Sequence, residues 1–551
     1  MSADDDRRSG RLADLSLLGA AWVIAVLLVD PRGDFPLNDD WAYFASVERL
    51  LRDGSLRPHD WAGMTLLSQT LWGGLAASLF GLTHVVLRLS TLLLGLLTVA
   101  GVYLLGRELR APRPIATAVA LALAANPLFL ALSHTFMTDV PMLAPMVWAL
   151  LAFARALRAD SRRAWAAGTA LGVVAVLCRQ PALVVPLALL AAVLFWPAAG
   201  WRWRARGALS VALAIAALRV WELAMAASID GLPANYGVRD AFLDRLWQSP
   251  LPSSLRLLFG NLVSALLYGG LFLLPLLVLF APGWRRARTS WLRWGGALQI
   301  AAVAVLALRL AASGRRMPVA GNVLIASGIG PVTLHDWYIR GLANDPRLPD
   351  AFWLAVTVAA VLGAGLLVAQ GVAAARLAWD EARRGAPARA MLLAGGALYA
   401  GITCLTIPFD RYYLALLPML GLALIPPAPR ALPRSAWTAA IALLGLSAAF
   451  AIAATHDYLA WNRARWAALR LLTEVEGVDP RRIDGGPEFN GPRFFLPNTA
   501  GGGGRSWWWV VDDEYLITMG PVPGYEMARR HPYRRWLPPG EAAITVQRRT
   551  R

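Results

Sequence analysis

The chain has 551 residues, of which 57% are hydrophobic and only 16% are charged. Soluble domains are closer to roughly 45–50% apolar and about 25% charged, so this composition excludes an ordinary soluble protein. The formal charge of +18 comes entirely from arginine, and the arginines lie in short clusters between apolar blocks. That placement is typical of membrane topology signals and argues against a nucleic-acid partner.

The apolar blocks predict membrane-spanning helices, because a helix of about 20 apolar residues crosses a bilayer and satisfies its own backbone there. We predict 13 spans, at residues 14–30, 85–105, 115–131, 140–157, 164–178, 182–198, 207–228, 256–282, 295–312, 351–372, 390–408, 411–428 and 435–454. The first span follows Arg7, Arg8 and Arg11 and shows no convincing cleavage site, so we expect a retained signal anchor.

The arginine clusters all fall on one side of this predicted topology. They lie at residues 7–11, 107–113, 155–163, 202–206, 285–293, 376–389 and 430–434. The positive-inside rule therefore places the N-terminus in the cytoplasm of a cell whose cytoplasmic (inner) membrane carries this multi-pass protein. An odd number of crossings puts the loops after odd-numbered spans outside. Those loops hold or adjoin five charged residues, namely Asp39, Asp40, Asp139, Arg179 and Arg411.

The first outer loop, residues 31–84, is too long for a simple turn. Trp41, Phe44 and Val47 recur at helical spacing opposite Glu48 and Arg49, which predicts an amphipathic helix at the membrane interface. A second such helix is expected over 66–79, and the two helices could roof a cavity.

The pattern changes at His456, so we divide the chain into a transmembrane domain (1–455) and a small extracytoplasmic α/β domain (456–551). In the second domain, 458–475 predicts an amphipathic helix, and four segments predict strands: 481–483, 507–511, 515–518 and 543–547. The glycines at 501–504 lack the Lys-Ser/Thr ending of a phosphate loop and predict a flexible turn.

Asp39 and Asp40 form the most suggestive pair of polar residues. Adjacent carboxylates at an apolar helix end repel each other, and desolvation raises a pKa toward the range of a general base. Either residue could instead cap the helix that begins at Trp41, and one could cap while the other catalyses. Asp139 precedes Val140 and Pro141, so it too is either a cap or a second acidic site residue.

The remaining candidates would bind substrate. Arg179 is either a snorkelling arginine or a clamp for phosphate, whose oxygens match a guanidinium. Arg219 and Glu222 lie one turn apart and are expected to pair, although a charged pair within a span is also a functional candidate. His134 is expected at the interface as a hydrogen-bonding residue. Arg411 and Tyr412 join charge and an aromatic ring at a helix mouth.

Three segments in this order carry a family resemblance: 38–43 (Asn-Asp-Asp-Trp-Ala-Tyr), 138–141 (Thr-Asp-Val-Pro) and 411–414 (Arg-Tyr-Tyr-Leu). Segments 457–466 and 483–490 add to it. The chain resembles the GT-C superfamily of membrane glycosyltransferases, in particular the family of protein O-mannosyltransferases and lipid A aminoarabinose transferases.

The resemblance implies a polytopic helical GT-C fold and transfer of a hexosyl or pentosyl group from a polyprenyl-phosphate carrier. The acceptor would be a hydroxyl of a lipid, polysaccharide or protein at the outer face of the membrane. The base of the family maps onto Asp39 with Asp40 beside it, and Asp139 is the second acidic residue. Relatives often carry Asp-Glu at this pair, which leaves the roles of Asp39 and Asp40 open. Six residues form the expected substrate-binding set: Tyr43, His134, Arg179, Arg219, Arg411 and Tyr412.

The chemistry of the residues agrees with this expectation. A lipid phosphate leaves without a proton donor if a cation stabilises it, whereas the acceptor hydroxyl needs a carboxylate base. Attack opposite the phosphate would invert the anomeric carbon. No metal is expected to be obligatory, but Asp39, Asp40 and Asp139 are hard oxygen ligands suited to Mg²⁺ or Mn²⁺. Cys178 and Cys404 are expected to be free thiols. The alternatives are a transporter or flippase for an envelope precursor and a scaffold without transfer activity.

Overall fold

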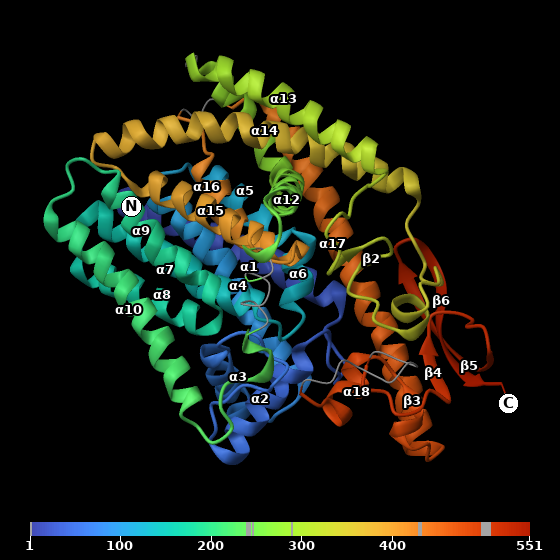
Figure 1. The fold of residues 1–551 in the computed structure, drawn as a ribbon. Helices are drawn as coiled ribbons and strands as arrows, with labels where there is room; N and C mark the ends of the chain where they lie inside the picture. The colour runs from blue at the N-terminus through green and yellow to red at the C-terminus, as the bar shows by residue number, and fades with distance from the viewer. Residues whose placement is uncertain are drawn as a thin grey trace.

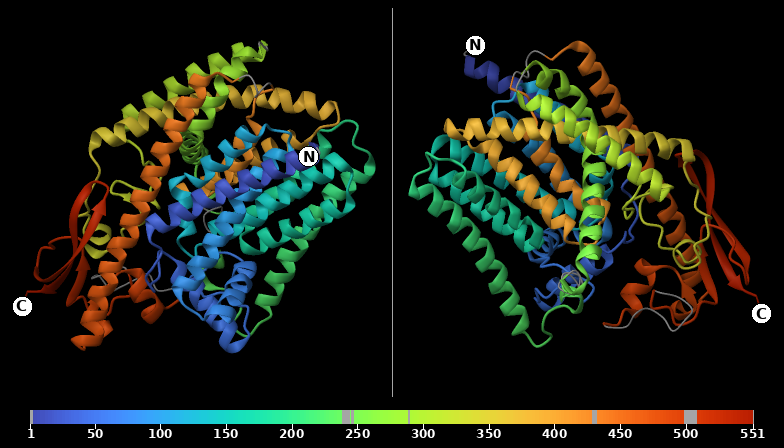
Figure 2. Two further views of the ribbon diagram at one scale, coloured as in Figure 1. Left: turned by 180° about the vertical axis from the view of Figure 1, so that it is seen from behind. Right: turned by 45° about the horizontal axis from the view of Figure 1, so that its top comes forward.

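The protein is a multi-pass helical membrane protein with a small sheet at one end (Figure 1). The computed structural model describes residues 3–237, 244, 247–287, 290–427, 432–497 and 508–550. The blue N-terminal helix and the red C-terminal sheet lie on different sides of the molecule in all three views (Figures 1 and 2). The predicted fold class, a helical membrane domain with a small C-terminal sheet, is therefore confirmed.

Each predicted span falls on helical structure. The helices of this part are α1 (Ala3–Val29), α4 (His84–Glu108), α5 (Arg113–Ala124), α6 (Pro127–Ser133), α7 (Asp139–Ala159), α8 (Arg162–Cys178), η1 (Gln180–Leu183), α9 (Val184–Leu194), α10 (Trp201–Ala226), α12 (Leu251–Arg286), α13 (Ser290–Ser313), α14 (Asp350–Arg383), α15 (Ala388–Cys404), η4 (Asp410–Ala415), α16 (Leu416–Ala423) and α17 (Arg434–Arg470). Among the described residues, 8 helices are long and apolar enough to cross a membrane, or 9 with one bent pair. The number of 13 crossings stays a prediction.

The bent pair is the predicted span 115–131, which the structure divides into α5 and α6 at an angle of 64°. Asn126 causes the break, because its side-chain oxygen accepts the backbone N–H groups of Leu128 and Phe129, at 3.0 Å each. Pro127 then begins α6 at a position where its missing N–H costs nothing. The single-helix prediction for this span was wrong for that reason.

Residues 31–84, which were predicted as the first outer loop, fold into α2 (Asp40–Asp53) and α3 (Leu67–Phe80), close to the two predicted interfacial helices. The chain that enters α2 is held by the buried Arg88, which donates to the carbonyl oxygens of Pro31 (2.6 Å), Gly33 (2.9 Å) and Phe35 (3.0 Å). These bonds give the Nη1 and Nη2 atoms of a buried charge backbone acceptors and fix the start of the loop.

The predicted boundary at 455/456 lies inside α17, which continues without a break to Arg470 and then through a turn, η6 (Leu471–Val475). The separate helix predicted for 458–475 is therefore the end of one long helix. Beyond it lie η7 (Pro480–Arg482), β3 (Ile483–Asp484), α18 (Pro487–Phe494), β4 (Tyr515–Thr518), β5 (Tyr525–Trp536) and β6 (Pro539–Arg549). Both cysteines are free, as predicted.

The C-terminal strands form one sheet in the order β3-β4-β6-β5, in which only the β3–β4 pair is parallel. The predicted strand 515–518 is β4, and 543–547 lies inside β6. The strand predicted at 481–483 was mostly wrong, since 480–482 is a 3₁₀ turn. Residues 508–511 are not in a strand, whereas 507 and the turn predicted at 501–504 lie outside the described residues, as does part of the arginine cluster at 430–434.

The loop between α13 and α14 packs with this sheet. It contains the short strands β1 (Leu324–Ile325) and β2 (Gly328–Ile329) and a π-helical turn, η3 (His335–Ile339). His335 bonds Asp484 at 2.8 Å, and Asp336 accepts the backbone N–H groups of Met519 (2.9 Å) and Gly520 (3.1 Å). The loop between α13 and α14 and the segment from β3 to β6 thus pack together as one unit, the C-terminal unit.

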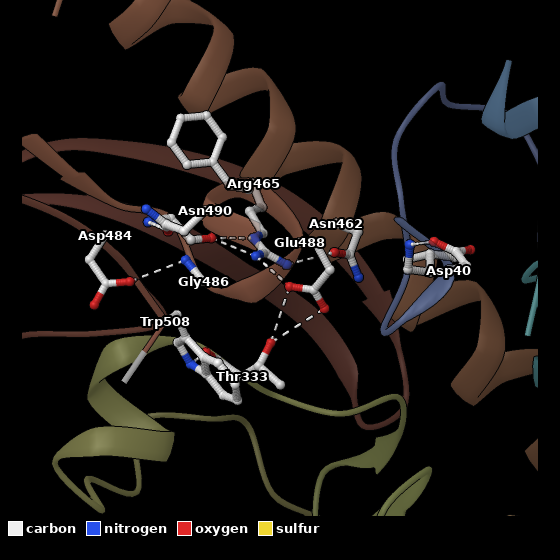
Figure 3. A network of polar contacts seen from close by, with 12 residues as sticks. Asp40, Thr333, Asn462, Arg465, Asp484, Gly486, Glu488, Asn490 and Trp508 are labelled. Carbon is white, nitrogen blue, oxygen red and sulfur yellow. Dashed lines mark hydrogen bonds and ion pairs between the residues drawn. The ribbon is translucent and has the colours of Figure 1, made fainter. Parts of the chain in front are cut away.

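A buried polar network joins α17 to this unit (Figure 3). Arg465 donates to Glu488 at 2.7 Å, to the carbonyl oxygen of Gly485 at 3.0 Å and to Asn462 at 3.4 Å. Glu488 also accepts from the Thr333 hydroxyl at 3.3 Å. Arg465 is fully buried, and each of its guanidinium nitrogens has an acceptor.

Candidate active site

Asp39 and Asp139 stand at the starts of α2 and α7, but neither side chain serves as a cap. Asp39 is the N-cap residue of α2 without a side-chain capping bond, and α7 likewise begins after Thr138 without one, within the described residues. Both carboxylates face arginines instead. The capping interpretation of these two residues is therefore not what the structure shows.

Asp139 pairs with Arg179. The Arg179 Nη1 atom lies 2.9 Å from Asp139 Oδ1, and both side chains are buried. Arg179 reaches this position because α8 ends at Cys178 and the chain continues in extended conformation before η1. Its guanidinium also lies 4.4 Å from the ring centroid of Tyr412, in cation–π geometry.

Asp39 faces Arg411. The Arg411 Nη2 atom is 3.8 Å from Asp39 Oδ2, and Asp39 keeps 27% of its side chain exposed. The Arg411 guanidinium lies 5.6 Å from the centroid of the same Tyr412 ring. The two arginine–aspartate pairs therefore meet at one aromatic ring, although Asp39 and Arg411 are hundreds of positions apart along the chain.

Arg411 is placed by its neighbour Asp410, which is fully buried. Asp410 accepts backbone N–H groups from Leu324 (2.6 Å), Val323 (3.1 Å) and Asn322 (3.2 Å), and also from Arg411 itself (2.7 Å). These bonds tie η4 to the strand β1 of the outer loop. The start of η4 is consequently rigid, and Arg411 projects from a fixed backbone.

Several buried polar atoms of these pairs have no partner among the described residues. They are Oδ2 of Asp139 and both Nε and Nη1 of Arg411. A buried polar atom without a partner costs roughly 1–3 kcal/mol, more when it is charged, so such atoms are expected where a ligand binds. The orphaned arginine donors match the acceptor oxygens of a phosphate.

A cavity of about 240 Å³ lies beside the pairs. Arg179 and Tyr412 line it directly, whereas Asp39, Asp139 and Arg411 are not among its wall residues. Its other wall residues are Gly63, Met64, Gln180, Pro181, Asn235, Tyr399, Ile402, Thr403, Thr406, Ile407 and Phe409. The walls are mostly apolar with a few polar groups, as in a site for an amphipathic ligand.

A larger groove of about 740 Å³ adjoins the cavity and shares Ile407 and Phe409 with it. Arg256 and Arg315 supply its charged groups. Both arginines are exposed.

Asp40 has a different environment from Asp39. It is 3% exposed, and its two oxygens accept the backbone N–H groups of Leu37 (2.6 Å) and Phe136 (3.2 Å). Burial raises the pKa of Asp40 to about 6. That pKa suits a base, but the hydrogen bonds of Asp40 show a structural role, because they connect the loop that contains Leu37 to the loop that contains Phe136. Asp40 forms no ion pair with an arginine among the described residues and does not line the cavity.

The other predicted binding residues are distributed unevenly. Tyr43 is buried in α2, and its pKa is raised by burial and then by the charge of Asp39, which places the phenol near that carboxylate. His134 is fully buried with Nδ1 bonded to the Leu130 carbonyl at 2.7 Å, and it does not line the cavity. Arg219 pairs with Glu222 at 2.7 Å, as predicted, with 72% of its side chain exposed, and it does not line the cavity either. Their roles in binding stay predictions.

The three aspartates do not fit a divalent cation. Asp40 is bonded to backbone amides, Asp139 to Arg179, and Asp39 faces Arg411. Two arginines adjacent to the carboxylates also oppose a second positive ion. In the described part of the chain, no group of three or more His, Cys, Asp or Glu side chains is arranged to hold a metal.

Two further residues at the site were not predicted from the sequence. Trp61 donates its indole N–H to Asp39 Oδ1 at 2.8 Å, and Tyr399 of α15 lines the cavity. Both are aromatic residues in a chain with 24 tryptophans and 12 tyrosines, so composition could not single them out. The position of Trp61 between two interfacial helices was the one available signal.

Residues 71–222 match the family described as dolichyl-phosphate-mannose-protein mannosyltransferase. This match confirms the resemblance drawn from the sequence motifs, over that segment. No curated protein matches the chain.

Solved structures of two kinds are similar to it. An oligosaccharyltransferase from Archaeoglobus fulgidus, tethered with an acceptor peptide, has 17% identity and a TM-score of 0.45, with 84% of this chain and 58% of that chain covered. The same enzyme in complex with an inhibitory peptide and a dolichol-phosphate has 16% identity, a TM-score of 0.43 and the same coverage. ArnT from Cupriavidus metallidurans bound to undecaprenyl phosphate has 13% identity and a TM-score of 0.39, with 97% of each chain covered. The chain thus spans 58% of the length of the oligosaccharyltransferase.

Proposed function

We propose that the protein is a glycosyltransferase that moves a sugar from a polyprenyl-phosphate carrier to a hydroxyl acceptor at the outer face of the cytoplasmic membrane. The observation that carries this proposal is the meeting of Asp39–Arg411 and Asp139–Arg179 at Tyr412, beside a mostly apolar cavity. The family match at 71–222 supports the same reaction class.

The arginines would bind the phosphate of the donor. Arg411 has two buried donors without partners among the described residues, and Arg179 lines the cavity. A guanidinium stays charged at every physiological pH, so it stabilises the negative charge that develops as the carbon–oxygen bond breaks. The apolar walls of the cavity suit the first part of the isoprenoid chain.

Asp39 would be the general base. It is the more exposed of the two adjacent aspartates, and its Oδ2 atom faces the arginine. As the acceptor oxygen bonds to the anomeric carbon, the hydroxyl proton passes to Asp39 and the bond from that carbon to the phosphate oxygen breaks. The electron pair leaves with the polyprenyl phosphate. Because attack is opposite the phosphate, the configuration at the anomeric carbon would be inverted.

Asp139 would act by holding Arg179 rather than by taking a proton. Its Oδ1 atom is bonded to Arg179, while Oδ2 has no partner in the described residues and could accept a sugar hydroxyl. Tyr412 lies under both guanidinium groups and keeps them together at one place. No metal ion is required for these roles.

A transfer assay with purified protein in liposomes tests the proposal. Asp39→Asn removes the base while it keeps the size of the side chain, so the initial rate should fall about 1,000-fold. Asp40→Asn is the matched control, because Asp40 bonds only backbone amides. It should lower the melting temperature and leave most of the transfer rate.

Mass spectrometry of envelope glycolipids and glycoproteins, with and without the gene, would identify the sugar and the acceptor. Unchanged transfer by the Asp39→Asn protein, or a product of retained configuration, would contradict the proposed mechanism. Solute movement without any transferred sugar would favour a transporter instead.

A further inference from the structure

The two oxygens of the Asp39 carboxylate have different partners. Oδ1 accepts the indole N–H of Trp61 at 2.8 Å, and Oδ2 lies 3.8 Å from the Arg411 guanidinium. The indole bond fixes the rotation of the carboxylate, because a partly exposed aspartate would otherwise turn about its last bond. With Oδ1 held, Oδ2 is the oxygen directed toward the arginine and the substrate.

Hydrogen bonds from two segments of the chain hold the backbone around Trp61. Its N–H donates to His59 Nδ1 at 3.2 Å, and its carbonyl oxygen accepts from the Asn235 side chain at 3.2 Å. The preceding residue, Asp60, pairs with Arg57 at 2.6 Å and accepts the N–H of Ala234 at 3.0 Å. Residues 234–235 belong to the segment after α10. The position of Trp61 is therefore set by contacts within its own loop and by contacts with this distant segment.

The ring of Trp61 is enclosed by other aromatic rings. Its centroid lies 5.2 Å from that of Trp509, 5.7 Å from that of Phe495 and 6.1 Å from that of Trp41. Trp509 and Phe495 belong to the C-terminal unit, and they contact each other at 5.0 Å. Trp509 also has a positive φ of 55°, which is uncommon for a bulky residue and costs energy. The backbone of the C-terminal unit is therefore locally strained at Trp509, which contacts Trp61.

We propose that Trp61 is a positioning residue for the reaction, held by Phe495 and Trp509 of the C-terminal unit. Its indole N–H orients Asp39, and the aromatic contacts fix the indole. The inference rests on the proposed function and extends it, because it gives the C-terminal unit a part in catalysis. The unit acts on the base through a ring more than 400 residues away along the chain.

A kinetic comparison of Trp61→Phe with the wild type tests the inference. Phenylalanine keeps an aromatic ring in the enclosure and removes only the donor. The rate constant kcat should fall about 10- to 100-fold, the range expected when a reacting group loses its orientation. The KM for the polyprenyl-phosphate donor should stay within about 2-fold, since the arginines and the cavity are untouched.

The matched control is Trp466→Phe in α17. The Trp466 ring also packs against aromatic rings, 6.4 Å from Phe35 and 6.1 Å from Phe489, but its indole nitrogen has no hydrogen-bond partner among the described residues. This variant should keep the kcat of the wild type. Phe495→Ala, which leaves the indole bond possible but removes part of the enclosure, should lower kcat by a smaller factor than Trp61→Phe without a change in KM.

The outcomes separate this inference from the proposed function. If Asp39→Asn abolishes transfer but Trp61→Phe keeps the wild-type kcat, the positioning role is wrong and the base remains. If Trp61→Phe lowers kcat only in step with a lower melting temperature, and Phe495→Ala at unchanged stability has no effect, the residue is structural and the inference fails. If Asp39→Asn transfers sugar normally, the proposed function itself fails.

Discussion

Arg465 and Arg411 are both buried arginines that face carboxylates, but their surroundings differ. Each guanidinium nitrogen of Arg465 has an acceptor, supplied by Glu488, the Gly485 carbonyl and Asn462 (Figure 3). Arg411 lies 3.8 Å from Asp39, and two of its nitrogens have no partner among the described residues. The first pair lies within a closed network, and the second lies next to a cavity.

The difference separates a structural ion pair from a binding site. A buried charge is tolerated when its hydrogen-bonding capacity is filled, and a satisfied pair has nothing left to offer a ligand. A buried arginine whose N–H donors lack acceptors destabilises the folded protein, and a bound ligand that supplies those acceptors removes the destabilisation. Burial of a charged pair is thus no evidence of function by itself, whereas its unused donors are.

The largest effect is expected on stability, at the closed network. Arg465→Met leaves Glu488 buried without its cation, so the free energy of unfolding should fall by about 3–5 kcal/mol. Thermal unfolding in detergent measures this loss. Protein that remains folded should keep the wild-type kcat/KM. A stable variant with impaired transfer would place this network in the reaction and break the comparison.

Arg411→Gln should act on kinetics instead. Loss of a charged contact to a buried group costs roughly 2–5 kcal/mol, so kcat/KM for the donor should fall by about 30- to 4,000-fold. The melting temperature should change less than in Arg465→Met, because Arg411 makes fewer bonds within the protein. Steady-state transfer at varied donor concentration measures the effect. Wild-type kinetics here would exclude Arg411 from the phosphate site.

His59 sets a pH limit on the loop that holds Trp61. Its pKa is lowered from 6.5 to about 4, first by burial and then by the charge of Arg49, with Arg57 acting in the same direction and Asp60 opposing them. Since the folded pKa lies below the unfolded value, this stability is full above pH 6.5 and is lost as the pH falls toward 4. Protonation also removes the acceptor for the Trp61 N–H.

The loss should reach about 2 kcal/mol, somewhat less than the full shift implies because the imidazole is partly exposed. Melting temperatures between pH 7.5 and pH 4.5 measure it. His59→Asn offers a side-chain oxygen in place of Nδ1 and does not titrate, so its melting temperature should fall less over the same range. Equal slopes for both proteins would rule out His59 as the cause.

The smallest effect is expected at Arg219. It pairs with Glu222 on α10, 72% of its side chain is exposed, and it does not line the cavity, so its loss leaves the predicted phosphate site intact. Arg219→Gln should therefore change neither the KM for the donor nor kcat by more than about 2-fold. A large rise in KM would restore Arg219 to the binding set that the sequence predicted.

The helical membrane character of the chain could be predicted from the sequence because apolar length acts over whole segments, while the number of crossings and their orientation stay predictions. That reading placed Asp139 and Arg179 on one face, and the structure pairs them. It could not separate Asp39 from Asp40, since neighbouring residues share every pattern and only the local hydrogen bonds distinguish them. It also missed β5, an edge strand with arginines along mostly exposed positions, where no alternation of apolar and polar residues marks a strand.

The end of α17 shows the same limit. Polar residues from His456 onward suggest a new domain, but the backbone of a helix is indifferent to leaving the membrane, so α17 continues to Arg470. Apart from Asn462 on the same helix, the hydrogen-bond partners of its buried Arg465 are Gly485 and Glu488, 20 and 23 residues further along the chain. Contacts of this kind depend on the tertiary fold and leave no local signal.

A structure of the protein with polyprenyl phosphate tests the central claim most directly. The account predicts the phosphate within about 3 Å of Arg411 Nε or Nη1, with the isoprenoid chain against the apolar walls of the cavity between Arg179 and Ile407. A phosphate bound at Arg256 and Arg315 in the adjoining groove, with the Arg411 donors left empty, would contradict it.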